Sequence, residues 1–378
     1  MKIRLISAIL ITAISLSACG KSTGDALEDI IVSTEEILAS PALLPSEMNS
    51  SNASESGDIP AEEVSDEESP DKTNVAVKIV FNPHVFSERD TIRWGEDTRE
   101  TFFNFVDALR NGDETFECVS ESAFYNATGG RLINYYFPVA SVFFYQDYNI
   151  VFTYDEGIGR INYNGDKERF LEIEKEFERV VTDILNENVK PSYSDFEKAM
   201  ALYLYMSTAY TYDFDMYEIM YTRYCEEITT YRAMVEKMGI CQELSGIYNY
   251  LLLQCGVESD VIGGTDHQWN FVNINGKDYH IDPTWGLSNP YIEDGKTPLE
   301  YFLMTDEDRE ANSGYLINTF GICGLDGTES REMFDFAATD ESFKPFRLSY
   351  FIDMDTDKNI VTYYDFIRDE TQTFQYVD

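Results

Sequence analysis

The chain has 378 residues, with 69 Asp and Glu against 28 Lys and Arg, and its formal net charge is −41. This charge argues against nucleic acid as a partner and against electrostatic docking on anionic lipid, because both require basic residues. The cysteines form no CxxC pair typical of a zinc site, and we expect neither a metal nor a cofactor.

The N-terminus has the pattern of an export signal. Lys2 and Arg4 precede an apolar stretch at 5–16, which is too short to span a bilayer and ends in LSAC at Cys19. This ending resembles a bacterial lipobox, whose Cys becomes the lipidated N-terminus; the alternative is an ordinary signal peptide with a chance Cys. We therefore expect residues 1–19 to be a lipoprotein signal peptide. The mature chain would then be exported and anchored by lipid to the extracytoplasmic face of the bacterial cell membrane.

Residues 20–75 are rich in Ser, Glu, Asp, Ala and Pro and contain no aromatic residue. Fourteen acidic residues stand there against Lys21 and Lys72. Such a segment buries too little apolar surface to offset its ordering entropy, so it is predicted to be a disordered acidic linker.

Residues 76–194 are predicted to form an N-terminal α/β region. A helix is expected near 98–110, and the run VASVFFYQDYNIVFTY at 139–154 has the composition of strands. The segment 167–185 places apolar residues at helical spacing, which predicts an amphipathic helix.

Residues 195–378 are predicted to form a second domain with a C-terminal extension. Ser194 stands three residues before Glu197, a capping-box pattern that begins one helix. A later helix begins at or just after Cys241 and is ended by Gly256. Its expected apolar face consists of Leu244, Ile247, Tyr248, Leu251 and Leu252.

The position of Cys241 has chemical consequences. At a helix N-terminus, unpaired backbone N–H groups and the positive end of the helix dipole favour the thiolate, which is the nucleophilic form. The plainer interpretation is a small buried residue in a tight turn, since buried free Cys is common. Only a nearby base makes the thiol a candidate nucleophile.

The stretch HQWNFVNINGKDYHIDPTW supplies a candidate base. Asn275 and Gly276 predict a two-residue type I′ hairpin. In this hairpin the residue numbers of two facing residues sum to 551, so Ile274 faces Lys277. This register puts His267 and Asp282 on one face as diagonal neighbours, within reach of a carboxylate–imidazole hydrogen bond. A Cys, a His 26 residues later and an Asp 15 beyond it suggest a thiol acyl-transfer site.

These segments, GICQELSGIYNYLLLQCGV and HQWNFVNINGKDYHIDPTW, resemble the transglutaminase-like superfamily, which is related to papain-type thiol enzymes. YTYD at 210–213 is similar to the usual preamble of that group, and the resemblance covers residues of about 195 to 290. It implies an α+β fold with a papain-like core, in which the Cys-bearing helix packs on an antiparallel sheet bearing the His and the Asp. It also implies a triad of Cys241, His267 and Asp282. The chain departs from the family at Glu243 and Leu244, where a small Gly and an aromatic residue are frequent.

His280 is the rival base, because the same register places it on the face of Asp282, opposite Phe271. The family pattern favours His267, which precedes Trp-Asn. Trp269 is expected to pack at the margin of the site and keep water from the ion pair, and His84 to be structural or exposed.

The run DMDTDKNIVTYYD places acids at alternate positions of an EF-hand loop from Asp353. Lys358 stands where Gly is needed and Tyr364 where a bidentate Glu is needed, so an acidic turn between two strands is the preferred interpretation.

Two function classes follow. The first is a cell-envelope thiol enzyme that forms a thioester on Cys241 and passes the acyl group of a peptide or protein to water or an amine. Cell-wall peptides are among the candidate substrates. The second is a surface binding or scaffolding module that keeps the fold without turnover. The complete set of triad residues favours the enzyme.

Overall fold

The structure is a computed structural model, and it describes residues 78–145, 151–223, 225–264, 267–287, 295–313, 321–322, 334 and 336–377. Residues Val77–Asp378 form one compact unit. The predictions for Cys19, for the signal at 1–19 and for the linker at 20–75 lie outside the described residues. Among the described helices, none combines the length and the apolar character that crossing a membrane requires.

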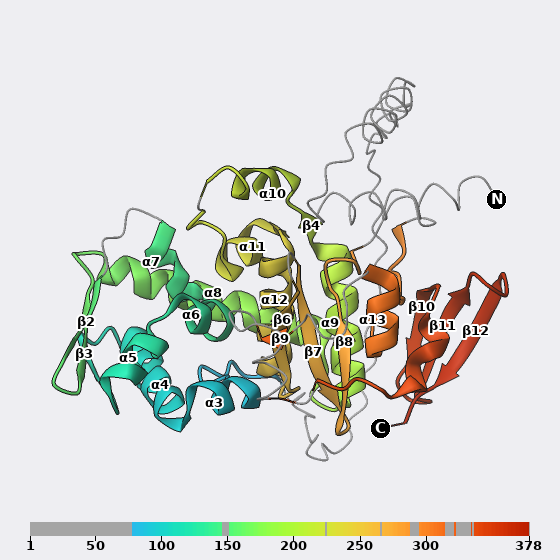
Figure 1. Cartoon of the computed structure of the whole chain (residues 1–378), viewed down its shortest axis with the longest axis horizontal. Coiled ribbons are helices and arrows are strands. Elements are labelled where there is room, and N and C mark those ends of the chain that lie inside the picture. Colours follow the sequence, from blue (N-terminus) through green and yellow to red (C-terminus); the bar gives the residue numbers. More distant parts are fainter. Residues whose placement is uncertain are drawn as a thin grey trace, which may run out of the picture. The chain divides into compact units, whose positions relative to one another are not determined.

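Helices make up most of the chain before the central sheet (Figure 1). They are α3 (Glu88–Trp94), α4 (Glu96–Asn111), α5 (Glu121–Ala127), α6 (Gly130–Tyr136), η1 (Pro138–Ser141), α7 (Val142–Tyr145), α8 (Lys167–Asn188), α9 (Asp195–Ala209), α10 (Phe214–Met220), α11 (Thr230–Glu236) and α12 (Cys241–Gln254). Two more follow, α13 (Asp306–Ser313) and η3 (Glu341–Phe346).

The described strands form four small sheets, and every pairing except β4–β5 is antiparallel. The first sheet has the order β1 (Thr115–Glu117), β3 (Ile158–Asn162) and β2 (Val151–Asp155). The second is two-stranded and consists of β4 (Thr211–Tyr212) and β5 (Met238–Gly239). The four-stranded sheet has the order β8 (Lys277–Ile281), β7 (Gln268–Ile274), β6 (Ser259–Gly263) and β9 (Gly321–Ile322). The last contains β10 (Ser349–Asp355), β11 (Ile360–Asp365) and β12 (Glu370–Gln375). Helices combined with antiparallel sheets confirm the α+β class.

Three predicted helices are confirmed, and one predicted strand run is partly wrong. Helix α4 covers the segment expected near 98–110, α8 covers 167–185, and Ser194 and Glu197 form the expected capping box of α9. The run at 139–154 begins instead as the helical segments η1 and α7, and its described end, from Val151, is a strand as expected. Pro138 begins the helical turn, and a short apolar run that is buried on all sides has no periodicity to separate helix from strand.

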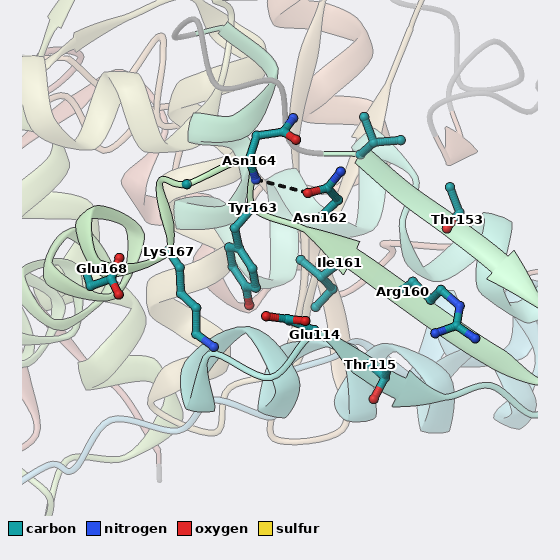
Figure 2. A pocket seen from close by; sticks show the side chains of 12 residues that line it. Glu114, Thr115, Thr153, Arg160, Ile161, Asn162, Tyr163, Asn164, Lys167 and Glu168 are labelled. Carbon is teal, nitrogen blue, oxygen red and sulfur yellow. Dashed lines mark hydrogen bonds between the residues drawn. The ribbon is translucent and has the colours of Figure 1, made fainter.

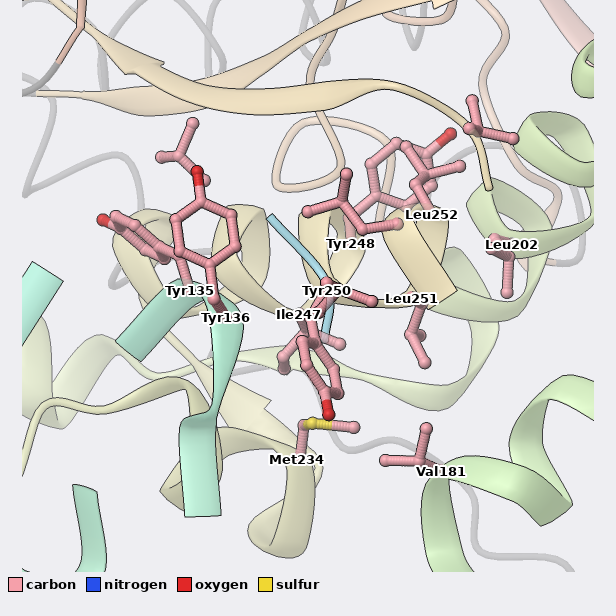
Figure 3. Packing of buried hydrophobic residues seen from close by; sticks show 14 of the residues in the cluster. Tyr135, Tyr136, Val181, Leu202, Met234, Ile247, Tyr248, Tyr250, Leu251 and Leu252 are labelled. Atoms are coloured by element: carbon pink, nitrogen blue, oxygen red, sulfur yellow. The ribbon is translucent and has the colours of Figure 1, made fainter. Parts of the chain in front are cut away.

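Helix α12 lies at the centre of the unit, against α6, α9 and α11 and against β6 and β7 of the four-stranded sheet. Figure 3 shows its side chains among Tyr135, Val181, Leu202 and Met234, which come from four other helices. Every residue of α12 except Gln242 is buried. The expected apolar face is therefore real, but the opposite face is buried as well. A helix enclosed on all sides gives its first residue a rigid position.

The hairpin has the predicted register. Ile274 pairs with Lys277, and the ladder continues without a slip to Asn270 opposite Ile281. The two loop residues, Asn275 and Gly276, have φ of 53° and 79°, the left-handed values that a type I′ turn requires.

The acidic run near residue 355 is a turn between strands β10 and β11, as preferred. Asp355 accepts a hydrogen bond from the backbone of Lys358 and pairs with its ammonium at 2.5 Å. No cluster of three or more His, Cys, Asp or Glu side chains suited to a metal ion is found among the described residues. The division of the compact unit at residue 194 stays a prediction.

Candidate active site

Cys241 is the first residue of α12, as expected, and only 9% of it is exposed. The residue before it, Ile240, has extended backbone geometry, and no hydroxyl or carboxylate at this position accepts a hydrogen bond from the first turn. The thiol therefore lies where backbone N–H groups and the helix dipole create a positive potential.

Glu243, the third residue of α12, has a structural role. Its side chain is fully buried and accepts hydrogen bonds from the backbone N–H groups of Ile240 (3.0 Å) and Thr229 (2.9 Å). Its two oxygens also receive the guanidinium of Arg232 at 2.9 and 2.5 Å. Glu243 thus fixes the start of α12 to α11, and its carboxylate is directed to these partners.

The YTYD segment joins the same cluster. Asp213 accepts a hydrogen bond from Arg232 at 2.9 Å and begins α10 by accepting one from the backbone of Met216. Strand β4 pairs in parallel with β5, which puts Tyr212 opposite Gly239, two residues before the Cys. A Cβ at Gly239 would lie 2.8 Å from the Cβ of Ala233, so only glycine allows this close approach. The turn that presents the thiol is held from both sides.

The predicted carboxylate–imidazole pair is present. His267 lies just before β7 and Asp282 just after β8, and His267 Nε2 is 2.7 Å from Asp282 Oδ2. Both side chains are buried. Because Nε2 is engaged by the carboxylate, Nδ1 is the ring atom that can meet the thiol of Cys241.

Asp282 is surrounded by hydrogen-bond donors. Its Oδ1 accepts the backbone N–H groups of Thr284 (3.0 Å) and Trp285 (3.1 Å), so the chain turns at Asp-Pro-Thr-Trp around the carboxylate. Its Oδ2 accepts from His267 and from Arg309 Nη1, which is also 2.7 Å away. Four donors hold this carboxylate in one orientation.

The electrostatic balance favours the protonated imidazole. Burial lowers the pKa of His267, but the charges of Asp282 and Cys241, and hydrogen bonds to both, raise this pKa to about 9. Burial opposes ionisation of Asp282 as well, yet His267 and Arg309 lower its pKa to about 2. The site therefore favours an imidazolium at His267 beside the Asp282 carboxylate.

His280 is engaged elsewhere. Its Nδ1 accepts the indole N–H of Trp269 (3.0 Å), so Nε2 carries the proton and donates it to Asp306 at 2.9 Å. Burial lowers the pKa of His280 despite its hydrogen bond to Asp306. Both ring nitrogens are used, and neither remains for a thiol. The ring of Trp269 stacks on His267 with centroids 5.9 Å apart, which agrees with its expected place at the margin of the site.

Arg309 is the residue that sequence reasoning missed. It is fully buried, donates to Asp282, and lies with its guanidinium carbon 4.2 Å from the ring centre of Trp269. Helix α13 carries both Arg309 and Asp306, so one helix holds Asp282 directly and His280 at the same time. A signal was present in the sequence, because Arg309 is the single basic residue in the acidic segment TDEDREANS.

One further hydrogen bond connects the helix to the hairpin. Asn270, which follows Trp269 in β7, donates from its side chain to the backbone carbonyl of Ser245 in α12 at 3.0 Å. Both residues are buried, so this bond fixes the strand that follows His267 against the helix that begins at Cys241.

Other candidate groups lie outside this arrangement. His84 bonds to Asp107 at 2.8 Å and stacks on Phe103, which fits the structural role expected of it. Burial raises the pKa of Cys118 and raises that of Cys255 to about 12, which keeps both thiols protonated. Cys323 lies outside the described residues.

A pocket in the N-terminal part is lined by residues of β1, β2, β3 and the start of α8 (Figure 2). Its lining carries both signs of charge, on Glu114, Glu168, Arg160 and Lys167. No residue of the candidate active site lines it, and its lining contains no Cys, Ser or His.

Comparisons with known proteins add little to this geometry. No protein-family model matches the chain, and no curated protein matches it. One solved structure, described as the crystal structure of a TGase, is similar over 36% of this chain at 14% identity and a TM-score of 0.25. The match spans 43% of that protein's own length. At this similarity the match shows no family, and function is inferred from the geometry of the site.

Proposed function

We propose that the protein is a thiol enzyme that transfers acyl groups from peptide or protein amides through a Cys241 thioester. The observation that carries the proposal is the buried His267–Asp282 pair, with the second ring nitrogen available to a thiol at the N-terminus of a buried helix. The three residue roles and the transglutaminase-like assignment belong to this proposal.

The steps balance without any cofactor. The Cys241 thiolate attacks the amide carbon, and an S–C bond replaces the C–N bond. The imidazolium of His267 gives its proton to the leaving amine. Water or a second amine then attacks the thioester and gives its proton to His267, and the thiolate is restored. Asp282 holds the ring and stabilises its charge throughout.

Alkylation of the thiol tests the nucleophile directly. The full chain treated with iodoacetamide at pH 6 is expected to be modified at Cys241, and Cys241→Ala is expected to lose at least about 90% of the rapid label, because a thiolate paired with an imidazolium reacts where ordinary thiols are protonated. The measurement is mass spectrometry of the labelled peptides over time.

Cys225→Ala is the matched control for this experiment, since Cys225 is a described, partly exposed thiol outside the site. Its loss should leave the rapid label unchanged. Rapid labelling that persists in Cys241→Ala, on Cys118 or Cys323 for instance, would contradict a specially activated Cys241. A reactive Cys241 without turnover of any amide would favour the binding-module alternative.

We further propose that the chain is exported and tethered by lipid at Cys19, with residues 20–75 as a spacer that like charges extend. Cys19→Ser is expected to move the protein from the membrane fraction into the medium or the soluble envelope fraction. The measurement is immunoblotting of separated fractions. A mutant that stays with the membranes would show that the lipobox interpretation is wrong.

A further inference from the structure

Helix α10 follows strand β4 and exposes large apolar side chains. Phe214, the first residue of the helix, is 59% exposed, and Tyr221, the residue that follows the helix, is 62% exposed. No residue of α10 is buried. A short helix that presents aromatic rings to solvent without a core of its own has the character of a binding surface.

The exposed rings join two half-buried ones in a continuous row. Tyr212 lies against Phe214 with ring centres 4.9 Å apart and against Tyr217 at 6.0 Å, and Tyr217 lies against Tyr221 at 5.2 Å. The hydroxyls of Tyr217 and Tyr221 are also 3.1 Å apart. We call these four residues, Tyr212, Phe214, Tyr217 and Tyr221, the aromatic wall.

The inner end of the aromatic wall lies beside the turn that carries Cys241. Tyr212 pairs through its backbone with Gly239, two residues before Cys241. Burial raises the pKa of Tyr212, and the electrostatic influence of Cys241 raises it further, so the phenol lies near the sulfur. The aromatic wall therefore runs from solvent, at Tyr221, toward the turn that carries Cys241. Figure 1 shows α10 beyond α11, with β4 leading into it.

The charge around the aromatic wall is negative. Residues 214–227 contain four carboxylates, on Asp215, Glu218, Glu226 and Glu227, and a single cation, Arg223, which already pairs with Glu227. Acidic groups beside aromatic faces attract ammonium and guanidinium groups, both by charge and by cation–π contact.

We propose that the aromatic wall binds the substrate peptide through an aromatic or large aliphatic residue with a Lys or Arg beside it, and so delivers the neighbouring amide to Cys241. The inference rests on the proposed function, since it names the substrate class of the same thiol. A second copy of the chain is disfavoured as the occupant, because a protein with a net charge of −41 repels itself most strongly at an acidic face.

Binding can be measured without turnover in the full chain carrying Cys241→Ala. Three fluorescein-labelled peptides serve as probes, Gly-Lys-Phe-Gln-Gly-Gly and the same sequence with Ser for Phe or with Glu for Lys. Fluorescence anisotropy should show that the parent peptide binds at least about tenfold more tightly than either analogue, because each analogue loses one of the two attractive contacts.

The aromatic wall is then tested by adding Phe214→Ser and Tyr221→Ser together. These exposed residues have few contacts to lose, so the fold should survive, and the parent peptide should bind at least about tenfold more weakly. Ile92→Ser and Ile367→Ser are matched controls, since both residues are exposed apolar side chains on other elements, and binding should stay within about twofold of the parent protein.

Several results would overturn the inference. They are undetectable binding of the parent peptide, equal binding of the three peptides, and equal loss in the Ile92→Ser and Ile367→Ser controls. Sedimentation that shows a dimer which the double substitution dissolves would assign the aromatic wall to a second copy instead. Failure of the proposed function is separate. If peptides bind the aromatic wall while Cys241 in the unmodified chain resists iodoacetamide at pH 6, the aromatic wall is a peptide-binding surface and the proposed enzymatic function is wrong.

Discussion

Replacing Asp282 by Asn is expected to lower amide turnover by about 10³- to 10⁴-fold, because the imidazole of His267 loses both the acceptor that orients it and the charge that stabilises its protonated form. In the structure Asp282 Oδ2 lies 2.7 Å from His267 Nε2. The measurement is the initial rate of amine release from a peptide amide.

The pH dependence provides a sharper test than the rate. Activity of the unmodified chain should fall as the pH rises through about 9, where His267 loses the proton that the leaving amine requires. Removing the negative charge of Asp282 disfavours the imidazolium and lowers the pKa of His267. The descending limb should therefore move to lower pH, by about 1 to 3 pH units.

Two histidine variants control this experiment. His267→Gln should remove activity, whereas His280→Gln should cost far less, since His280 is held by Trp269 and Asp306 and has no nitrogen available for the thiol. Thermal unfolding followed by circular dichroism shows whether each variant is folded. If His280→Gln moves the pH profile as much as His267→Gln, and Asp282→Asn leaves it unchanged, the wrong histidine has been assigned.

Arg309→Met is expected to lower turnover by about 10- to 100-fold and to move the descending limb to higher pH. Two effects combine. The positive charge beside Asp282 is removed, so the carboxylate has His267 as its only cationic partner from this pair of bonds. The imidazolium is then more stable, and the pKa of His267 rises. The cation that packs on Trp269 is also lost, which loosens the ring stacked on His267. Small displacements of a catalytic group have effects of this size.

Arg309→Lys separates the two effects. Lysine keeps the charge but lacks the planar fork and its packing on the indole, so turnover should still fall while the pH profile stays near that of the unmodified chain. The measurement is the pH dependence of turnover for both variants. If Arg309→Met and Arg309→Lys lose activity equally and neither moves the limb, Arg309 acts only on stability and does not position Asp282.

Local sequence patterns were enough to predict several elements. Asn275-Gly276 predicts the type I′ turn because few residues tolerate φ > 0 at both positions, and the turn then determines which residues face each other across the hairpin. The diagonal relation of His267 to Asp282 follows from that register alone. The helix that begins at Cys241 and the capping box at Ser194 are likewise encoded within a few residues.

Other features were decided only by tertiary packing. The run from Val139 is helical because it lies inside the core, where a short apolar segment shows no pattern that separates helix from strand. The sequence placed both His267 and His280 beside Asp282. The tertiary structure distinguishes them because Asp306, 26 residues beyond His280, occupies one of its nitrogens.

The partners of the buried charges were also decided by tertiary packing and not by local sequence. Nothing within a few residues of Asp282 reveals Arg309, and nothing near Cys241 reveals that Arg232 neutralises Glu243. Ion pairs between residues distant in the chain depend on which elements the core brings together, and burial then makes each pair necessary, since an unpaired buried charge is costly. By itself the sequence determined the candidate nucleophile, the candidate carboxylate and two candidate bases. The tertiary structure decided which histidine meets Asp282 and which charges hold that carboxylate in place.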